Sequence, residues 1–468
     1  MVVVTPEPLR RRSRVLVVTL DTIAERMAGP AIRAWEISRA LADEHDVRLV
    51  TFGRCACEGA GFEARQIQVA DFRAEVSASD VVIIQGFVFN AFPWLQTCDQ
   101  VLVVDLYDPF QLETLEVDRH KPMKDRHRAL AFALGELSLQ LRRGDFFMCA
   151  SARQRDLWIG HLAAAGRINP DTYDVDPGLS SLISIVPFGT SAQPALQAHH
   201  AIKGATAGIG VDDKVVLWGG GVYNWFDPLT LVRAIDVVRV SVPEVRLYFL
   251  GMKHPNPDVP QMAVAARCRQ LSDELRLTGT HVFFNEGWVP YEQRADYLLD
   301  ADIGVSCHFQ HVETEFSFRT RILDYLWAGL PIVSTEGDSF AALVAAEDLG
   351  RAVPAEDVDA LVAALLEVLT SDSTQQRFRA NVRRVADDFR WPRVLEPLLA
   401  FCRSPVRSAD AERIALEAST PVPGSSLAAQ WEADVRAVVR HFRSGGIRQV
   451  VAKVRWRTAR RRAARSPR

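Results

Sequence analysis

Long apolar segments are missing from this chain of 468 residues. A helix that spans a membrane needs about 18 or more consecutive apolar residues, and no such run occurs. The apolar stretch after the arginines of residues 10–14 is only long enough for a strand before Asp21 interrupts it. We therefore expect neither a spanning helix nor a secretory signal peptide.

Cysteine is scarce and odd in number, with seven residues scattered over the whole length. Several stand in apolar runs, where a free thiol behaves as a small hydrophobic side chain, so we expect a reducing compartment, the cytoplasm. Cys55 and Cys57 have one residue between them and no second pair at metal spacing, which argues against a zinc site.

Several motifs that carry chemistry are also missing. The chain has no GxGxxG dinucleotide fingerprint, no GxxxxGK[ST] phosphate loop, no GxSxG elbow and no HExxH pair. A hydrolase of these classes would therefore lack its nucleophile or its metal.

The composition, 48% hydrophobic and 24% charged, is that of a soluble globular protein with room for two domains. The net charge of -3 conceals an asymmetry. Residues 435–468 hold twelve Lys or Arg and no acid, so residues 1–434 carry -3 - 12 = -15. A basic tail follows an acidic body.

Two series of strands and helices predict two doubly wound α/β domains. In the first half, β-branched runs that end on small or polar residues predict buried parallel strands; they lie at 14–20, 47–52, 81–84, 101–104, 146–149 and 183–186, with helices at 31–42 and about 124–142. In the second half, strands are expected at 215–218, 246–250, 282–284 and 303–306, with helices at about 227–238, 291–299, 358–369 and 373–388.

The predicted domains leave a cleft between them. The boundaries are residues 1–190 for the first domain, 191–213 for a linker and 214–388 for the second domain; 389–404 form a helix that crosses back and 405–468 a basic tail. Ligands of open parallel sheets bind at the carboxyl ends of the strands, so the cleft is the expected site.

Glycines follow the first strand of each domain. Gly219, Gly220 and Gly221 would let the backbone approach a diphosphate, although a simple tight turn is the alternative. Gly29 holds the matching place in the first domain and has the same two readings. Tyr223, after the second loop, could stack on a base or sugar, or pack the edge of the domain.

Polar residues follow two other strands. Asp105, Asp108 and Glu113 could offer a general base or bind sugar hydroxyls, or they could only cap a helix. His308 and His311 could belong to a metal cluster, but two histidines on a loop more often serve as polar loop residues. We expect no metal.

The stretch at 313–333, ETEFSFRTRILDYLWAGLPIV, places charged side chains around a short helix. If Ser317 caps a helix over about 318–327, Arg321 and Asp324 share one face and the carboxylates of Glu313 and Glu315 lie at its positive end. A solvated helix with one ion pair is the alternative.

This stretch resembles the donor-binding motif of GT-B glycosyltransferases, and most closely that of the retaining family 4 enzymes. A variant of their motif reads KxxEYxAxGxP; Arg321, Asp324, Tyr325, Gly329 and Pro331 match it, with Arg for Lys and Asp for Glu. The resemblance extends to VPFG at 186–189, to the run at 287–305 and to the loop near Gly29, and it spans roughly residues 14–400.

The resemblance implies a role for each matching residue. Asp324 would hydrogen-bond the ribose of a nucleotide sugar, and Arg321 and Arg319 would face the diphosphate beside Gly220 and Gly221. Glu313 or Glu315 would contact the transferred sugar. Glu315 and Asp108 are the candidate catalytic carboxylates.

The chain also departs from the family. The first carboxylate of the family motif falls on Phe316, one residue after Glu315. The family usually places an Arg and a Lys after the second glycine loop, whereas residues 222–228 contain no cation, so Arg319 and Arg321 are expected to compensate. First-domain strands end in Gln85 and Asp105 where many relatives have a histidine.

The expected function is transfer of a hexosyl or deoxyhexosyl group from a nucleoside diphosphate sugar to a glycan or lipid-linked acceptor, with retention, in polysaccharide or glycolipid synthesis. No permanent cofactor is expected, in agreement with the absence of a DxD motif. A nucleotide-sugar 2-epimerase on the same fold and a non-catalytic binding subunit at the membrane are the alternatives.

The basic tail indicates where in the cell the protein is expected to act. Residues 445–462 alternate apolar side chains with Arg and Lys, and a helix there would suit the anionic inner face of the cell membrane. Nucleic acid and a solvated disordered tail are the rival interpretations.

Overall fold

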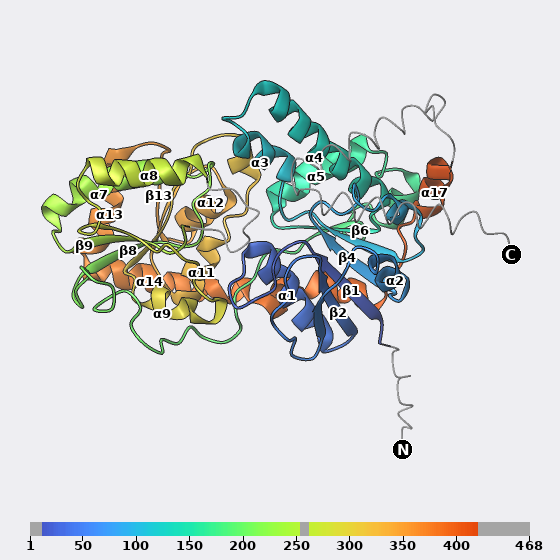
Figure 1. Cartoon of the computed structure of the whole chain (residues 1–468), viewed down its shortest axis with the longest axis horizontal. Coiled ribbons are helices and arrows are strands. Elements are labelled where there is room, and N and C mark those ends of the chain that lie inside the picture. Colours follow the sequence, from blue (N-terminus) through green and yellow to red (C-terminus); the bar gives the residue numbers. More distant parts are fainter. Residues whose placement is uncertain (1–11, 253–261, 420–468) are drawn as a thin grey trace, which may run out of the picture.

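Two parallel sheets, each in its own lobe, form the framework of the computed structural model, which describes residues 12–252 and 262–419 (Figure 1). The first sheet has the strand order β3-β2-β1-β4-β5-β6-β7 and the second the order β10-β9-β8-β11-β12-β13. Helices cover both faces of each sheet. The prediction of two doubly wound α/β domains is therefore confirmed.

The first sheet forms from β-branched runs whose side chains are buried on both faces. Residues 15–18 of β1 are fully buried, and Val17 is in parallel register with Leu49 of β2 and Ile83 of β4. The strands are β1 (Arg14–Thr19), β2 (Asp46–Thr51), β3 (Glu63–Gln66), β4 (Val81–Gln85), β5 (Val101–Asp105), β6 (Phe146–Cys149) and β7 (Ile183–Ile185).

The helices of the first lobe connect these strands as crossovers. They are α1 (Gly29–Ala42), α2 (Phe72–Ser77), α3 (Phe110–Val117), α4 (Met123–Arg143), α5 (Ala152–Ala164) and α6 (Pro170–Val175), with a 3-10 helix η1 (Pro93–Thr97). The apolar period of residues 31–42 and the long segment near 124–142 are helical as predicted, whereas β3, α5 and α6 were not predicted.

The second sheet repeats the design around β8. Its strands are β8 (Lys214–Trp218), β9 (Val245–Phe249), β10 (Val282–Phe284), β11 (Ile303–Ser306), β12 (Ile332–Thr335) and β13 (Gly350–Val353). Its helices are α7 (Pro228–Ser241), α8 (Ala263–Glu274), α9 (Arg294–Leu299), α10 (Val312–Phe316), α11 (Arg321–Ala328), α12 (Ser339–Ala346), α13 (Val358–Thr370) and α14 (Asp372–Ala386), with the 3-10 helices η2 (Tyr291–Gln293) and η3 (Asp387–Phe389).

After α14 the chain returns to the first lobe through α15 (Trp391–Val394) and α16 (Glu396–Arg403), drawn in orange in Figure 1. The Trp391 amide donates to the Thr190 carbonyl at 2.9 Å, and Phe401 stacks on Phe146 with 4.3 Å between ring centroids. The ring centroid of Phe188 lies 6.2 Å from that of Trp391 and 6.3 Å from that of Phe318 in the second lobe. One apolar core therefore extends across both lobes.

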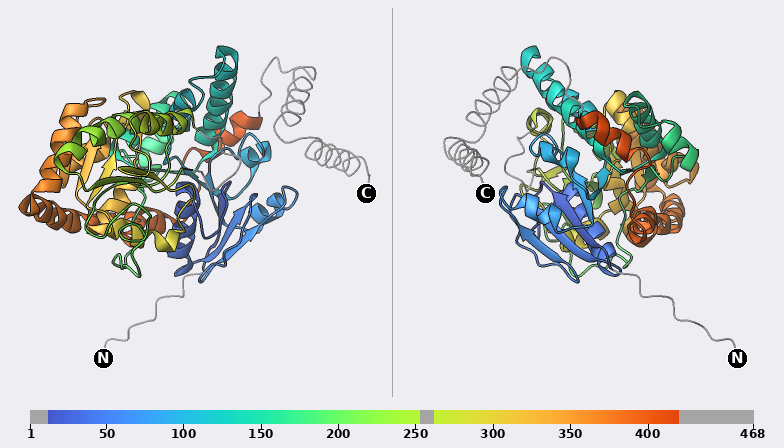
Figure 2. Two further views of the ribbon diagram at one scale, coloured as in Figure 1. Left: turned by 60° about the vertical axis from the view of Figure 1, so that its left-hand side comes forward. Right: turned by 90° about the vertical axis from the view of Figure 1, so that its right-hand side faces the viewer.

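Residues 404–419, most of which were assigned to the tail, pack on the first lobe. Asp410 accepts two hydrogen bonds from the buried Arg167, at 2.9 and 3.1 Å. Helix α17 (Ala411–Ser419) then packs against α4, and both views of Figure 2 show the two helices together. The basic segment predicted beyond this point lies outside the described residues.

Within residues 12–252 and 262–419, no helix combines the length and the apolar character needed to cross a membrane.

Candidate active site

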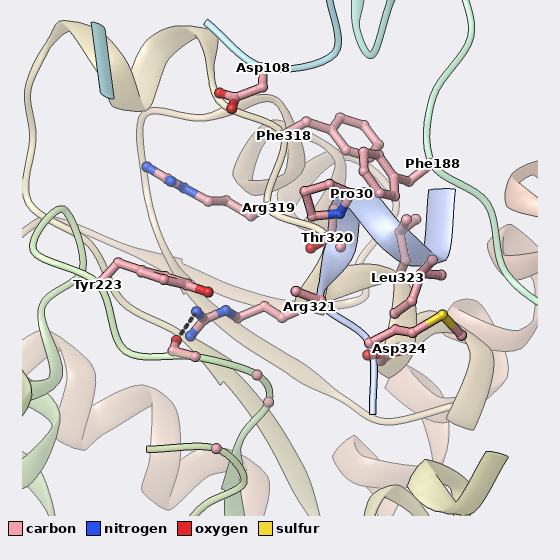
Figure 3. A pocket seen from close by; sticks show the side chains of 18 of the residues that line it. Pro30, Asp108, Phe188, Tyr223, Phe318, Arg319, Thr320, Arg321, Leu323 and Asp324 are labelled. Carbon is pink, nitrogen blue, oxygen red and sulfur yellow. Dashed lines mark hydrogen bonds between the residues drawn. The ribbon is translucent and has the colours of Figure 1, made fainter. Parts of the chain in front are cut away.

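A cleft of about 530 Å³ opens between the carboxyl ends of the two sheets. Its walls come from the loops after β1 and β5 in the first lobe and from the loops after β8, β9 and β10 and the start of α11 in the second. Figure 3 shows Asp108 and Arg319 toward one end, and Arg321, Leu323 and Asp324 toward the other. The expected cleft is thus present.

The glycine loop after β8 forms one wall. Gly220 has a φ of +75° and open space where a Cβ would stand, while a Cβ on Gly221 would lie 2.8 Å from the Tyr223 ring. The buried Tyr325 fixes the loop, because its hydroxyl accepts from the Gly219 amide at 2.8 Å. The loop therefore exposes backbone to the cleft without a side chain in the way.

Arg321 lies behind this loop and is 7% exposed. Its Nη2 donates to the Gly221 carbonyl at 2.8 Å, the dashed line in Figure 3, and its guanidinium lies 3.9 Å from the Phe226 ring centroid and 4.4 Å from that of Trp218. Nη1 is buried and has no hydrogen-bond partner among the described residues. Burial lowers the pKa of Arg321 to about 10, so the side chain stays charged at neutral pH.

Arg319 does not present a spare charge to the cleft. Its guanidinium makes a two-pronged ion pair with Glu313, at 3.0 and 2.8 Å, and both side chains are buried. Arg319 and Glu313 were both predicted as donor ligands; in the structure they pair with each other, while Arg319 also lines the cleft and its buried Nε has no hydrogen-bond partner among the described residues.

The helix predicted over 318–327 begins later, at Arg321, with Thr320 as its N-cap residue. Ser317 does not cap it: Ser317 is the C-cap residue of the separate helix α10, and its hydroxyl donates to the Thr314 carbonyl at 3.0 Å. Glu313 and Glu315 lie in α10, not in a loop before the donor helix. Glu315 faces solvent and takes no part in lining the cleft.

Asp324 lines the cleft but does not pair with Arg321. Its Oδ1 accepts from the Arg294 Nε at 3.2 Å, and the Asp324 side chain is 39% exposed. The Arg294 guanidinium lies between two aromatic rings, 3.8 Å from the centroid of Tyr291 and 4.2 Å from that of Trp327. The two rings hold the Arg294 guanidinium in place, and its hydrogen bond holds the Asp324 carboxylate in place.

Gly29 is the first residue of α1 and lines the opposite wall. Helix α1 has no side-chain cap at its N-terminus. The preceding loop touches the second lobe, because the Met27 carbonyl accepts from the Trp288 indole at 3.0 Å and the Glu25 carbonyl from the Tyr291 amide at 2.9 Å.

The acidic residues after β5 separate into two environments. Asp105 accepts from the buried Arg33 at 2.6 and 2.9 Å and from the Gln85 side-chain amide at 3.2 Å, and it does not line the cleft. Asp108 and Glu113 line the cleft and share a side-chain hydrogen bond. Burial raises the pKa of Asp108 to about 7 and that of Glu113 well above its ordinary value.

The two histidines considered as metal ligands have structural partners. His308 is buried and its Nε2 lies 3.1 Å from the Glu336 carbonyl; burial lowers its pKa to about 3. His311 caps α10, its Nδ1 accepting from the Thr314 amide at 3.4 Å. In the part of the chain that the structure describes, no group of three or more His, Cys, Asp or Glu is arranged to hold a metal ion.

Arg294 was not singled out from the sequence, and Glu113 was named only as a companion of Asp108. The run at 287–305 pointed to the region of Arg294, but its pairing with Asp324 spans thirty residues of sequence. A single chain offers no signal for such a contact.

Comparison with known proteins gives a consistent result. Residues 213–371 match the model of a family described as glycosyl transferases group 1. No match is found among curated proteins.

Solved structures share the architecture over most of the chain at low identity. Sucrose-phosphate synthase from Thermosynechococcus elongatus is similar with a TM-score of 0.62 and 16% identity, covering 84% of this chain and 98% of the synthase. WaaG, a glycosyltransferase of lipopolysaccharide biosynthesis, gives 0.57 and 16%, covering 83% and 100%. HepE from Anabaena, solved with UDP and glucose, gives 0.56 and 14%, covering 84% and 100%.

Two Rossmann-like lobes that face a cleft, shared with these structures, define the GT-B fold. The second lobe, over residues 213–371, is similar to the glycosyl transferases group 1 family. The resemblance found in the sequence is confirmed.

Proposed function

We propose that this enzyme transfers a hexosyl or deoxyhexosyl group from a nucleoside diphosphate sugar, with retention, to a glycan or lipid-linked acceptor in polysaccharide or glycolipid synthesis. One observation carries the proposal: the Arg321 guanidinium is buried beside an open glycine loop and keeps Nη1 without a partner among the described residues. A buried cation without a carboxylate suits an anionic ligand, and a forked guanidinium suits phosphate.

The donor would extend along the second lobe. The diphosphate would lie at the backbone of Gly220 and Gly221 and at Arg321, where positive charge stabilises the leaving group. The ribose hydroxyls would bind Asp324, whose carboxylate Arg294 holds in place. No metal enters this scheme, since the guanidinium and the backbone amides would take the phosphate charge.

The first lobe would hold the acceptor. Gly29 lies at the uncapped N-terminus of α1, where free amides favour an anionic group of the donor or acceptor. Glu313 would act through Arg319, since that ion pair already occupies both of its oxygens.

A thermal-shift screen of nucleotide sugars, followed by assays of nucleotide release, tests the proposal. The expected result is stabilisation by one class of nucleoside diphosphate sugar through mass action, and release of the nucleotide that accelerates when an acceptor is added. Failure of every nucleotide sugar to stabilise the protein would refute it.

A nucleotide-sugar 2-epimerase is the second candidate, because Asp108 and Glu113 give the cleft the acid and base carboxylates that such an enzyme needs. The same assay separates the two functions. An epimerase would convert its donor without an acceptor, whereas a transferase requires one, and a non-catalytic binding subunit would bind the donor without releasing nucleotide.

The basic tail carries a proposal about location: this cytoplasmic enzyme would bind the inner face of the cell membrane through residues 445–462. The full chain should co-sediment with vesicles that contain anionic lipid at low salt, and a chain ending at residue 419 should not. Equal sedimentation of the two chains would contradict it.

A further inference from the structure

Asp324 of the second lobe is connected to the first lobe through two other side chains. Its Oδ1 accepts from Arg294 Nε at 3.2 Å. Arg294 Nη1 in turn donates to the Tyr291 carbonyl at 2.7 Å, and the Arg294 guanidinium lies 3.8 Å from the centroid of the Tyr291 ring. The position of the Asp324 carboxylate therefore depends on the position of Tyr291.

Tyr291 is bonded to the first lobe at both of its ends. Its amide donates to the Glu25 carbonyl at 2.9 Å, and its hydroxyl donates to Glu36 Oε1 of helix α1 at 3.2 Å. Tyr291 opens the 3-10 helix η2, and Arg294 is the first residue of helix α9, which follows directly. Two hydrogen bonds from the first lobe thus hold the segment from which Arg294 projects.

Glu36 needs its hydrogen-bond donors because only 2% of the residue is exposed. Its other oxygen pairs with Arg39. Burial raises the pKa of Glu36, and Arg39 and the Tyr291 hydroxyl oppose that shift because both stabilise the carboxylate. A buried carboxylate that loses a donor is destabilised, so the bond to Tyr291 is favoured when the lobes lie as they do here.

Glu36 itself does not line the cleft, whereas Tyr291, Arg294 and Asp324 do. A donor in the cleft would not touch Glu36, and an effect of Glu36 on the donor would have to pass through the side chains between them. Arg294 has little freedom to move independently, because the Trp327 ring also packs on its guanidinium, at 4.2 Å from the ring centroid. A change at Tyr291 should therefore reach Asp324.

We propose that Glu36 is a positioning residue for the donor. Acting through Tyr291 and Arg294, it holds the Asp324 carboxylate where the ribose hydroxyls bind. This inference rests on the proposed function, in which Asp324 binds the ribose. Because the coupling of two binding events is reciprocal, the ribose of the donor would also stabilise the contact between the lobes. Donor binding would thus favour the arrangement in which the two substrates face each other.

The test compares two nucleotides that differ only at the ribose. The nucleoside diphosphate that gives the largest thermal shift among UDP, GDP, ADP and CDP is titrated by calorimetry beside its 2′,3′-dideoxy form. The ratio of the two Kd values measures recognition of the ribose hydroxyls, and in the wild-type full chain it should be about 10 to 100. A variant that only destabilises the protein should weaken the binding of both nucleotides alike and leave the ratio unchanged.

Three variants of the full chain test the path from Glu36. Tyr291→Phe keeps the ring beside Arg294 but removes the hydroxyl, and Glu36→Leu removes the acceptor of the same bond. Each should lower the ratio about threefold, which is in the lower part of the range for one hydrogen bond. Glu36→Gln retains an oxygen that can accept from the Tyr291 hydroxyl, so its ratio should stay within about 1.5-fold of the wild type.

Arg153→Met is the matched control for a contact between the lobes. Arg153 in α5 donates to the Gly337 carbonyl of the second lobe at 2.7 Å, and neither residue lines the cleft. The variant removes one hydrogen bond between the lobes without touching the path to Asp324. Its ratio should therefore stay within about 1.5-fold of the wild type.

The inference is overturned if Tyr291→Phe or Glu36→Leu keeps the wild-type ratio while Asp324→Ala abolishes the preference for the ribose. It is also overturned if Glu36→Gln or Arg153→Met lowers the ratio as much as Tyr291→Phe does. If no nucleoside diphosphate binds, or if Asp324→Ala leaves the ratio unchanged, the proposed donor site itself fails. The two failures are therefore distinguishable.

Discussion

Replacement of Arg321 by Met tests the donor site most selectively. The substitution removes the guanidinium but keeps an unbranched side chain that can pack against Trp218 and Phe226. In the wild type, Nη2 holds the Gly221 carbonyl at 2.8 Å and Nη1 has no partner among the described residues. One half of the guanidinium thus supports the loop, and the other half is available to a ligand.

Loss of the two halves should have effects of different size on nucleotide affinity and on folding stability. A charge-assisted hydrogen bond to the diphosphate in a buried site contributes about 3 kcal/mol, which is about 150-fold in Kd. The effect on folding is smaller, because the lost bond to Gly221 is offset by relief of the desolvation that lowers the pKa of Arg321 to about 10. The free energy of unfolding should change by about 1 kcal/mol or less.

Calorimetric titration of UDP, or of the nucleoside diphosphate chosen by the screen, measures the first effect, and urea denaturation the second. Arg351→Met is the matched control, since Arg351 also lies over a phenylalanine ring, 4.8 Å from the centroid of Phe378, but outside the cleft lining. Its nucleotide affinity should stay within about twofold of the wild type. An unchanged Kd in Arg321→Met would refute the assignment of the diphosphate site.

Three further variants test separate parts of the structure. Asp324→Ala should raise the donor KM about 10- to 100-fold through the lost ribose contact, and an unaltered KM would remove Asp324 from the donor site. Asp105→Asn leaves the buried Arg33 without its anionic partner, with only the Val186 and Pro187 carbonyls to accept from it, and should lower the free energy of unfolding in urea by about 3–5 kcal/mol; a change below about 1 kcal/mol would contradict the pairing. Asp410→Asn should destabilise the packing of residues 404–419 on Arg167 and increase proteolysis after residue 403, whereas wild-type resistance would show that the ion pair is dispensable.

The architecture could be predicted because each buried strand is recognisable from its own local sequence. A β-branched run such as residues 15–18 is buried on both faces of a parallel sheet, and the same pattern returned around β8. The order of strand, glycine loop and helix then placed Gly220 and Arg321 at the carboxyl edge of the second sheet, where the structure has them.

The details of the site depended on contacts that local patterns do not encode. Helix α11 begins at Arg321, with Thr320 as its N-cap residue, and Ser317 is the C-cap residue of the preceding helix α10. Arg319 was predicted to face the diphosphate, and its ion pair with Glu313 is a contact that the sequence did not indicate. The segment that contains Asp410 was assigned to the tail because its partner, Arg167, is distant in sequence. In each case a tertiary contact decided between two readings that were locally equivalent.

A crystal structure of the full chain with the bound nucleoside diphosphate that stabilises it tests the central claim most directly. We predict that its diphosphate lies within hydrogen-bond distance of Arg321 Nη1 and of the backbone amides of Gly220 or Gly221, with the ribose at Asp324. A nucleotide bound outside this cleft, or a diphosphate that leaves Arg321 without contact, would contradict the account.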